Sequence, residues 1–188
     1  NIVYHLDFPV GSLSSYPLWK LAEKTKKKNI KVVISGEGAD EIFGGYVRYM
    51  PIYTTWKLKK NFESYKPLFD KFYSNYLDVF ANITVRNEKT EIMRNKMKPI
   101  FEMFDDPISA MGFFDFKYVM PSLLQMGDRM SSAFGLENRC PFLDKDIINF
   151  AFSLPHNLKI KNLEQKILIR RLLKKKKLFQ PLRMEKKG

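Results

Sequence analysis

A short strand, a glycine turn and the start of a helix follow one another in KVVISGEGADEIFGGY, Lys31 to Tyr46. Lys31 to Ser35 is rich in β-branched apolar residues, Gly36 to Gly38 is a polar turn, and Ala39 to Phe43 has the composition of a first helical turn that ends at two glycines. In a parallel sheet such a turn lies at the carboxyl edge, where ligands bind and free N–H groups face anions. The stretch therefore predicts an α/β fold with a ligand site after this strand.

Three carboxylates, Glu37, Asp40 and Glu41, fall within five positions of this turn. Acids beside an anion-binding turn suit a divalent cation that bridges to phosphate, or an acid that acts on a substrate. The structural alternative is a solvated turn with acids that favour a helix start. The residues alone leave both open.

The composition describes one globular domain. The chain has 188 residues, of which 45% are hydrophobic, with sixteen Phe and nine Tyr, enough for a core. No apolar run approaches the roughly 18 residues that span a bilayer, and the N-terminus lacks a signal peptide's pattern. The single cysteine, Cys140, excludes an intrachain disulfide and fits a reducing compartment. We expect a cytoplasmic protein.

The formal charge of +13 is concentrated in three segments: Lys24 to Lys31, Arg170 to Lys177 and Arg183 to Lys187. A basic, non-catalytic nucleic-acid-binding module is one interpretation. However, lysines outnumber arginines, and the first run ends a helix, where cations favour the dipole without any ligand. Nucleic acid is therefore the less favoured partner.

The remaining chain predicts a strand and mostly helices. Asn1 to Leu6 is expected as a strand and Ser14 or Ser15 as the cap of the next helix, which makes the opening a β-α-β unit. Helices are also expected at Lys66–Phe80 and Lys89–Phe101. Asp105-Asp106-Pro107 is expected to start another, with Pro121 as a kink or boundary, and Asp144 to cap one that runs to Phe152. A last helix is expected at Glu164–Leu173, with Lys166 off its apolar face. One domain is the simplest account.

Three separated segments share one resemblance: SGEGADEIFGGY (Ser35 to Tyr46), DRMSSAFGLENRCPFLD (Asp128 to Asp144) and EQKILIR (Glu164 to Arg170). In this order, with HLD (His5 to Asp7) upstream, they resemble the C-terminal synthetase domain of glutamine-hydrolysing asparagine synthetases. The resemblance covers essentially the whole chain.

The resemblance implies an α/β fold of the ATP-pyrophosphatase type, a doubly wound parallel sheet that continues into a helical part. Residues 1–50 would be the β/α ATP-binding portion and residues 51–188 the mainly helical portion of one domain. In the family, ATP and Mg²⁺ serve to activate aspartate as β-aspartyl-AMP, and ammonia derived from glutamine by an N-terminal glutaminase domain attacks the acyl carbon. A homodimer of the full-length enzyme is one expectation.

The same resemblance assigns roles to residues of the motifs. Glu37 would be the catalytic carboxylate and Lys166 would neutralise the leaving pyrophosphate, while Ser35, Gly36 and Gly38 would contact ATP or pyrophosphate. Asp40 would hold Mg²⁺. Glu137 and Arg139 would form a substrate-side wall, or a buried ion pair that supports it.

Two parts of the family pattern do not occur in these residues: the Ser-Gly-Gly-x-Asp-Ser pyrophosphate loop and the glutaminase domain. The family places both upstream of His5, so we expect an N-terminally truncated fragment that is inactive and folds poorly alone. Phe8 also replaces an acid found in one subgroup. This leaves open a related amidotransferase or lactam-forming synthetase that acts on another carboxylate.

Overall fold

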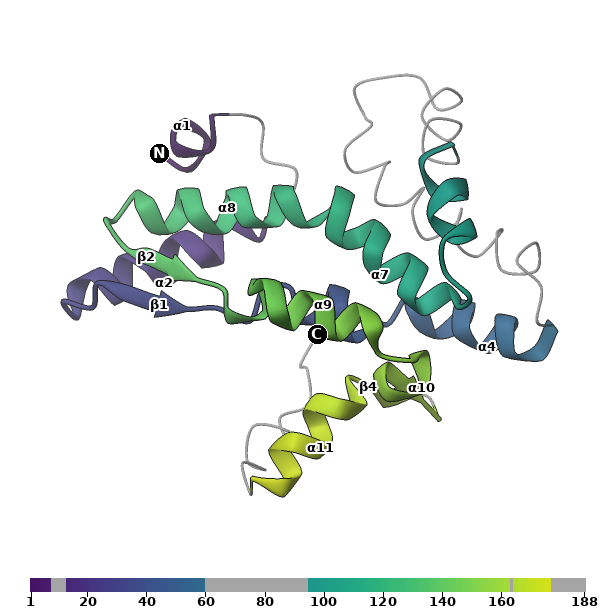
Figure 1. Ribbon diagram of the computed structural model, residues 1–188. Helices are drawn as coiled ribbons and strands as arrows, with labels where there is room; N and C mark the ends of the chain where they lie inside the picture. The colour runs from purple at the N-terminus through teal and green to yellow at the C-terminus, as the bar shows by residue number, and fades with distance from the viewer. Residues whose placement is uncertain (8–12, 60–94, 163, 177–188) are drawn as a thin grey trace.

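The structure is a computed structural model that describes residues 1–7, 13–59, 95–162 and 164–176. It is a mostly helical α/β arrangement with one small parallel sheet (Figure 1). The expected helix Lys66–Phe80 and the first part of Lys89–Phe101 lie outside the described residues, and 95–102 is helical. No helix in the described ranges has the length and apolar character needed to cross a bilayer.

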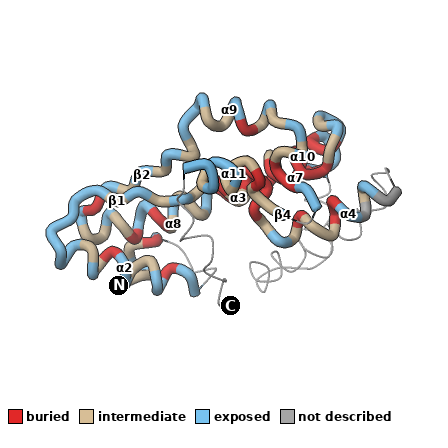
Figure 2. Tube along the Cα trace, turned by 90° about the horizontal axis from the view of Figure 1, so that it is seen from below, coloured by how far each residue is buried: buried red, intermediate tan, exposed pale blue. Residues whose placement is uncertain are grey.

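The strand expected after Lys31 is present as β1 (Val32–Ile34), and it pairs in parallel with β2 (Glu137–Arg139). Helices α2 (Ser15–Lys27) and α8 (Met120–Ser132) pack together beside this pair (Figure 2). Within the described residues the parallel sheet has only these two strands, so the wider doubly wound sheet is not seen. β1 nevertheless places the glycine turn at its carboxyl end, as expected.

The expected strand at Asn1 to Leu6 is wrong, because this segment is the short helix α1 (Ile2–Leu6). A strand needs a neighbouring strand for its backbone hydrogen bonds, and β1 pairs with β2 instead. As a helix, the segment buries Leu6 and packs on α8. The opening of the chain is therefore α-α-β rather than β-α-β.

Helix α7 (Pro107–Tyr118) starts at the cap that the sequence predicts. Oδ1 of Asp106 accepts hydrogen bonds from the backbone N–H groups of Ile108 and Ser109 at 3.0 and 2.9 Å, which satisfies two of the helix's first donors. The helix ends at Val119, and α8 follows with Pro121 in its first turn, where proline is tolerated. The expected boundary at Pro121 is confirmed, and the two helices run on across the molecule (Figure 1).

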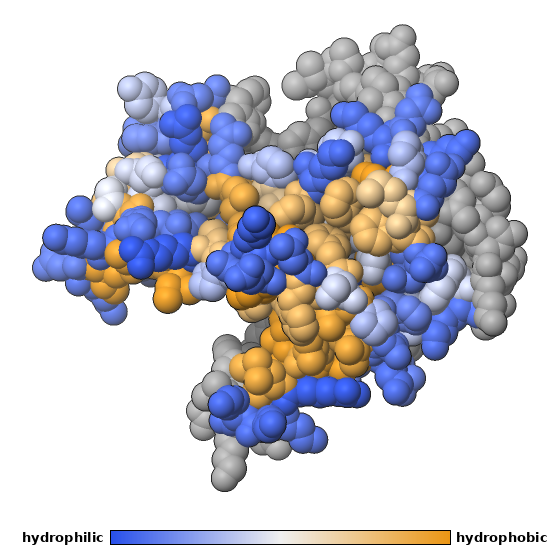
Figure 3. Space-filling view, viewed as in Figure 1, coloured by the Kyte–Doolittle hydropathy of each residue, from blue (hydrophilic) through white to orange (hydrophobic). Residues whose placement is uncertain are grey.

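Two hydrophobic clusters hold the helices together. The larger one joins α4 (Tyr49–Lys59), 95–102 and α7. The smaller one joins the short helix α3 (Ala39–Phe43) to α9 (Lys145–Ser153) and α11 (Ile167–Lys175) through Ile42, Phe43, Ala151 and their partly buried neighbours. Figure 3 shows apolar side chains gathered around α9 and towards α11. The second cluster is what brings the C-terminal part against α3.

The C-terminal part begins with α9, which Asp144 caps as expected: its Oδ1 accepts from the backbone of Asp146 at 2.9 Å. Helix α10 (His156–Lys159) then leads to an antiparallel pair, β3 (Ile160–Lys161) with β4 (Glu164–Gln165). The expected helix at Glu164–Leu173 is therefore wrong at its start. Lys166 adopts a left-handed conformation with φ of 52°, and helix α11 begins only after it.

Candidate active site

A cavity of about 330 Å³ opens at the carboxyl end of β1. One wall comes from the glycine turn and α3, and the opposite wall from the first turn of α8. The lining residues are Gly36, Glu37, Gly38, Asp40, Glu41, Tyr46, Met120 and Leu123. The volume lies within the range of small-molecule sites, and a few acids face an apolar wall, as is common in such sites.

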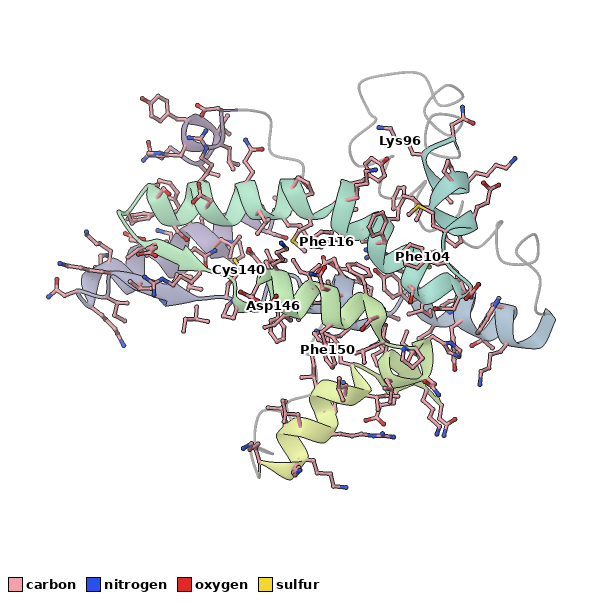
Figure 4. The ribbon with its side chains drawn as sticks, viewed as in Figure 1. Lys96, Phe104, Phe116, Cys140, Asp146 and Phe150 are labelled. Atoms are coloured by element: carbon pink, nitrogen blue, oxygen red, sulfur yellow. The ribbon has the colours of Figure 1, made fainter. Side chains whose placement is uncertain are left out.

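Strand pairing places β1 and β2 residues next to one another at this edge. The backbone N–H of Ser35 donates to the carbonyl of Arg139 at 2.8 Å, and the Ser35 hydroxyl lies 3.2 Å from the thiol of Cys140. Cys140 follows β2 directly and lies near the middle of the molecule (Figure 4). Its thiol donates to Oε2 of Glu37 at 3.5 Å, while burial raises the pKa of the thiol. Cys140 is a neighbour of the site that the sequence reasoning missed.

Glu37 is a half-buried carboxylate in the turn between β1 and α3. Gly127 of α8 leaves room for it, since a Cβ at that position would lie 2.7 Å from Oε1 of Glu37. Burial raises the pKa of Glu37, and the hydrogen bond from Cys140 opposes this rise. A carboxylate with a raised pKa is a better proton acceptor than one in water.

Asp40 in α3 and Lys166, the residue before α11, form an ion pair that joins two distant segments of the chain. Nζ of Lys166 lies 2.9 Å from Oδ1 of Asp40, and each side chain keeps about 30% of its surface exposed (27% and 31%). Gly45 makes the pair possible, because a Cβ there would lie 2.0 Å from Oδ1 of Asp40 and 2.1 Å from Cε of Lys166. Asp40 lines the cavity together with Glu37, whereas Lys166 is not among the lining residues and adjoins the cavity through its ion pair with Asp40.

The glycines of the turn have different constraints. Gly38 has φ of 90°, and a Cβ on it would lie 2.4 Å from Cδ2 of Leu143, so both its conformation and its space require glycine. Gly36 is exposed, with open space where a Cβ would be. Both line the cavity with backbone atoms, whereas Ser35 is not among the lining residues and its hydroxyl contacts Cys140 instead.

Glu137 and Arg139 do form an ion pair, with Oε1 and Nε 2.8 Å apart. The expectation that the pair is buried is wrong, because the two side chains are 58% and 62% exposed. They lie two residues apart on β2 and point to the same, open face, as alternate strand residues do. Neither residue lines the cavity.

A second set of charges extends from the cavity wall towards α7. Glu41, only 3% exposed, accepts a short hydrogen bond from the hydroxyl of Tyr46. Arg48 stacks on the Tyr46 ring, 3.7 Å from its centroid, and its Nη2 lies 2.7 Å from Oδ2 of the fully buried Asp115, which also accepts from Tyr49. From the sequence, Glu41 is predicted only as one of three acids near the glycine turn. Its burial depends on α7, which no local pattern could reveal.

No group of three metal-ligating side chains occurs among the residues that the structure describes. Asp40 is the cavity acid that is paired with a lysine, and its ion pair with Lys166 uses Oδ1 only. Mg²⁺ typically takes one or two carboxylates and completes its shell with phosphate oxygens and water. A single such carboxylate beside a lysine is therefore compatible with a magnesium–nucleotide complex.

Comparison with known proteins adds a decisive observation: residues 1–184 match the protein-family model described as asparagine synthase. The chain belongs to the asparagine synthase family. The asparagine synthetase [glutamine-hydrolyzing] 1 of Bacillus subtilis (strain 168) is 29% identical over 209 residues, which cover 91% of this chain and 32% of that protein. No solved structure matches the chain.

Plant members of the asparagine synthase family give the same result. Asparagine synthetase [glutamine-hydrolyzing] 1 of Arabidopsis thaliana is 31% identical over 170 residues, 89% of this chain and 20% of that protein. The asparagine synthetase [glutamine-hydrolyzing] of Triphysaria versicolor is 27% identical over 85% of this chain and 19% of its own length. The chain thus spans between about a fifth and a third of the length of these relatives.

Proposed function

We propose that the cavity after β1 is the site at which an asparagine synthetase activates and amidates aspartate. ATP would convert the β-carboxylate into β-aspartyl-AMP, and ammonia derived from glutamine would displace AMP. The observation that carries this proposal is the ion pair that joins Lys166, from the C-terminal part, to Asp40, which lines one cavity with Glu37 in a chain of this family. The relatives' names supply the identity of the substrate.

Amide formation from a carboxylate needs a leaving group, because a carboxylate itself is a poor electrophile. Adenylation provides one, at the cost of concentrating phosphate charge beside the reacting acid. Such a site must hold the phosphates and the acyl group in fixed positions and offer positive or N–H groups to the departing pyrophosphate. The turn after β1 and Lys166 offer both kinds of group.

Glu37 suits the proton-transfer step. Ammonia must lose a proton when it adds to the acyl carbon, and a cavity carboxylate whose pKa is raised by burial is suited to accept it. The Cys140 thiol and the space left by Gly127 fix where the Glu37 carboxylate lies. We therefore assign Glu37 as the general base.

Lys166 and Asp40 suit the phosphate side. Lys166 carries a point charge that can neutralise pyrophosphate, and Ser35, Gly36 and Gly38 supply a hydroxyl and backbone groups at the strand end. Asp40 would hold Mg²⁺, which in such a site screens phosphate charge. The proposal requires no other protein ligand for the metal than a carboxylate at this position.

The test is pyrophosphate release from ATP by the complete gene product, measured with aspartate and with a panel of other carboxylates. Pyrophosphate release that depends on aspartate in the wild type, together with loss of amide formation in Glu37→Gln, supports the proposal. Release only with another carboxylate would show a related amidotransferase or lactam-forming synthetase. Steeply salt-dependent retention of DNA or RNA, with ATP turnover unaffected by Glu37→Gln, would instead favour a nucleic-acid-binding module.

A further inference from the structure

Glu41 has a feature that the proposed chemistry does not use: it lines the cavity yet is almost fully buried. Of the three cavity acids, Asp40 is already paired with Lys166, and the proposed chemistry uses Glu37 as the general base. Within the described ranges, no Lys, Arg or His side chain comes within ion-pair distance of Glu41. Its resolved side-chain partner is the Tyr46 hydroxyl.

The nearest guanidinium does not satisfy Glu41. Arg48 directs Nη2 at Asp115, 2.7 Å away, and covers the Tyr46 ring with its guanidinium plane. Among the described residues the cluster thus brings together two buried carboxylates, Glu41 and Asp115, and the guanidinium of Arg48. Burial raises the pKa of Glu41, and the charge of Asp115 adds to this rise. A buried carboxylate is costly unless a cation or several donors reach it.

The surrounding structure fixes Glu41 and Tyr46 in place. Gly112 of α7 allows α3 to approach so closely that a Cβ there would lie 2.4 Å from the carbonyl oxygen of Glu41. The guanidinium of Arg48 covers the Tyr46 ring, and the ion pair with Asp115 holds Arg48 in place. The acceptor group formed by Glu41 and Tyr46 is therefore preorganised, as a recognition site requires.

A compact cation that enters the cavity would complete this cluster. An α-ammonium group has three N–H donors, which match the Glu41 carboxylate and the lone pairs of the Tyr46 hydroxyl. Met120 and Leu123 line the same cavity, and their apolar surface strengthens the attraction between opposite charges beside it. We infer that Glu41 and Tyr46 bind the α-ammonium group of the amino-acid substrate and so determine its specificity. This inference rests on the proposed function.

The discriminating experiment uses succinate, which has the reacting carboxylate of aspartate but no α-ammonium group. Wild type, Glu41→Gln and Tyr46→Phe forms of the complete gene product are compared for pyrophosphate release, with Glu102→Gln, an exposed acid, as the matched control. Succinate is assayed as a substrate and as a competitor of aspartate. Thermal melting verifies that each variant is folded, and Tyr46→Phe keeps the ring if Glu41→Gln does not fold.

We expect Glu41→Gln to raise the KM for aspartate by roughly 10- to 100-fold, the effect of losing a charged hydrogen bond. The KM for ATP and the kinetics or inhibition constant of succinate stay unchanged, so the preference for aspartate over succinate falls by the same factor. Tyr46→Phe gives a smaller change in the same direction.

Two results would overturn the inference while leaving the proposed function intact. One is a wild-type KM for aspartate in Glu41→Gln, which would mean that Glu41 is merely protonated. The other is an equal loss with ATP, aspartate and succinate, which would mean a structural role. Absence of aspartate-dependent pyrophosphate release in wild type would refute the proposed function and the inference with it.

Discussion

The ammonium of Lys166 lies 2.9 Å from the Asp40 carboxylate, so the residue before α11 reaches the first turn of α3. The contact exists because β4 and the left-handed backbone of Lys166 turn the chain immediately before α11, and because Gly45 leaves the space between the two side chains. An ordinary surface ion pair would not need such a gap. This arrangement predicts a functional pair rather than a stabilising one.

Lys166→Met should lower kcat/KM for aspartate-dependent pyrophosphate release by on the order of 100-fold, as expected when one group that stabilises developing charge is removed. The melting temperature should change little, because partly exposed ion pairs contribute about 1 kcal/mol or less. Lys161→Met, on the exposed side of β3, is the matched control. If Lys166→Met were as active as Lys161→Met, Lys166 would have no role in pyrophosphate release.

Gly45→Ala tests whether the ion pair between Asp40 and Lys166 needs the space that Gly45 leaves. The added methyl would overlap Oδ1 of Asp40 and Cε of Lys166, two atoms at the ends of flexible side chains. The pair should therefore separate at a cost of about 1–3 kcal/mol, the usual range for overpacking, and activity should fall towards that of Lys166→Met. Gly36→Ala, where no atom lies within 4 Å of the new methyl, is the control for melting only. Full activity in Gly45→Ala would contradict the assigned role of the pair.

Glu37→Gln should abolish amide formation yet raise stability at neutral pH. Burial raises the folded-state pKa of Glu37, so the folded protein holds this proton at pH values where the unfolded chain has lost it. Stability is therefore lost as the pH rises from the unfolded value of 4.5 through the raised folded value, and it remains lost at pH 7. The gain in melting temperature should vanish below pH 4.5. A lower melting temperature at pH 7 would argue for a structural carboxylate.

Lys159 is buried at the N-terminal end of α7, where its Nζ contacts the Ser109 hydroxyl at 3.2 Å. Burial lowers its pKa to about 8. Because the folded state binds this proton less tightly than the unfolded chain, stability rises with pH between about 8 and 10.5. Lys159→Met should stabilise the protein at pH 7 by about 1–3 kcal/mol and remove this rise. A destabilised variant at pH 7 would show that the ammonium has a stronger partner than Ser109.

Local signals in the sequence were sufficient for several elements. The β-branched run before Gly36 predicts β1, and the aspartates Asp106 and Asp144 predict the starts of α7 and α9. These signals suffice because a strand's composition and a helix cap depend on residues that are neighbours in the chain. The same reasoning failed at Ile2 to Leu6. An apolar β-branched segment suits either a strand or a short buried helix, and the available partner decides between them.

Contacts between distant segments could not be predicted from local patterns. That Cys140 lies beside Ser35 and Glu37 follows from the register of β1 against β2, and the burial of Glu41 follows from its packing on α7. The resemblance to a family, by contrast, predicts that Glu37, Asp40 and Lys166 serve one site. It did not indicate that Glu137 and Arg139 lie on an open face.

The central claim is that this cavity forms an acyl adenylate from aspartate and ATP. Exchange of radiolabelled pyrophosphate into ATP by the complete gene product, without any ammonia source, reports that step directly. We predict exchange that requires aspartate and is lost in Lys166→Met. Exchange that proceeds equally well without aspartate, or that survives unchanged in Lys166→Met, would contradict the account.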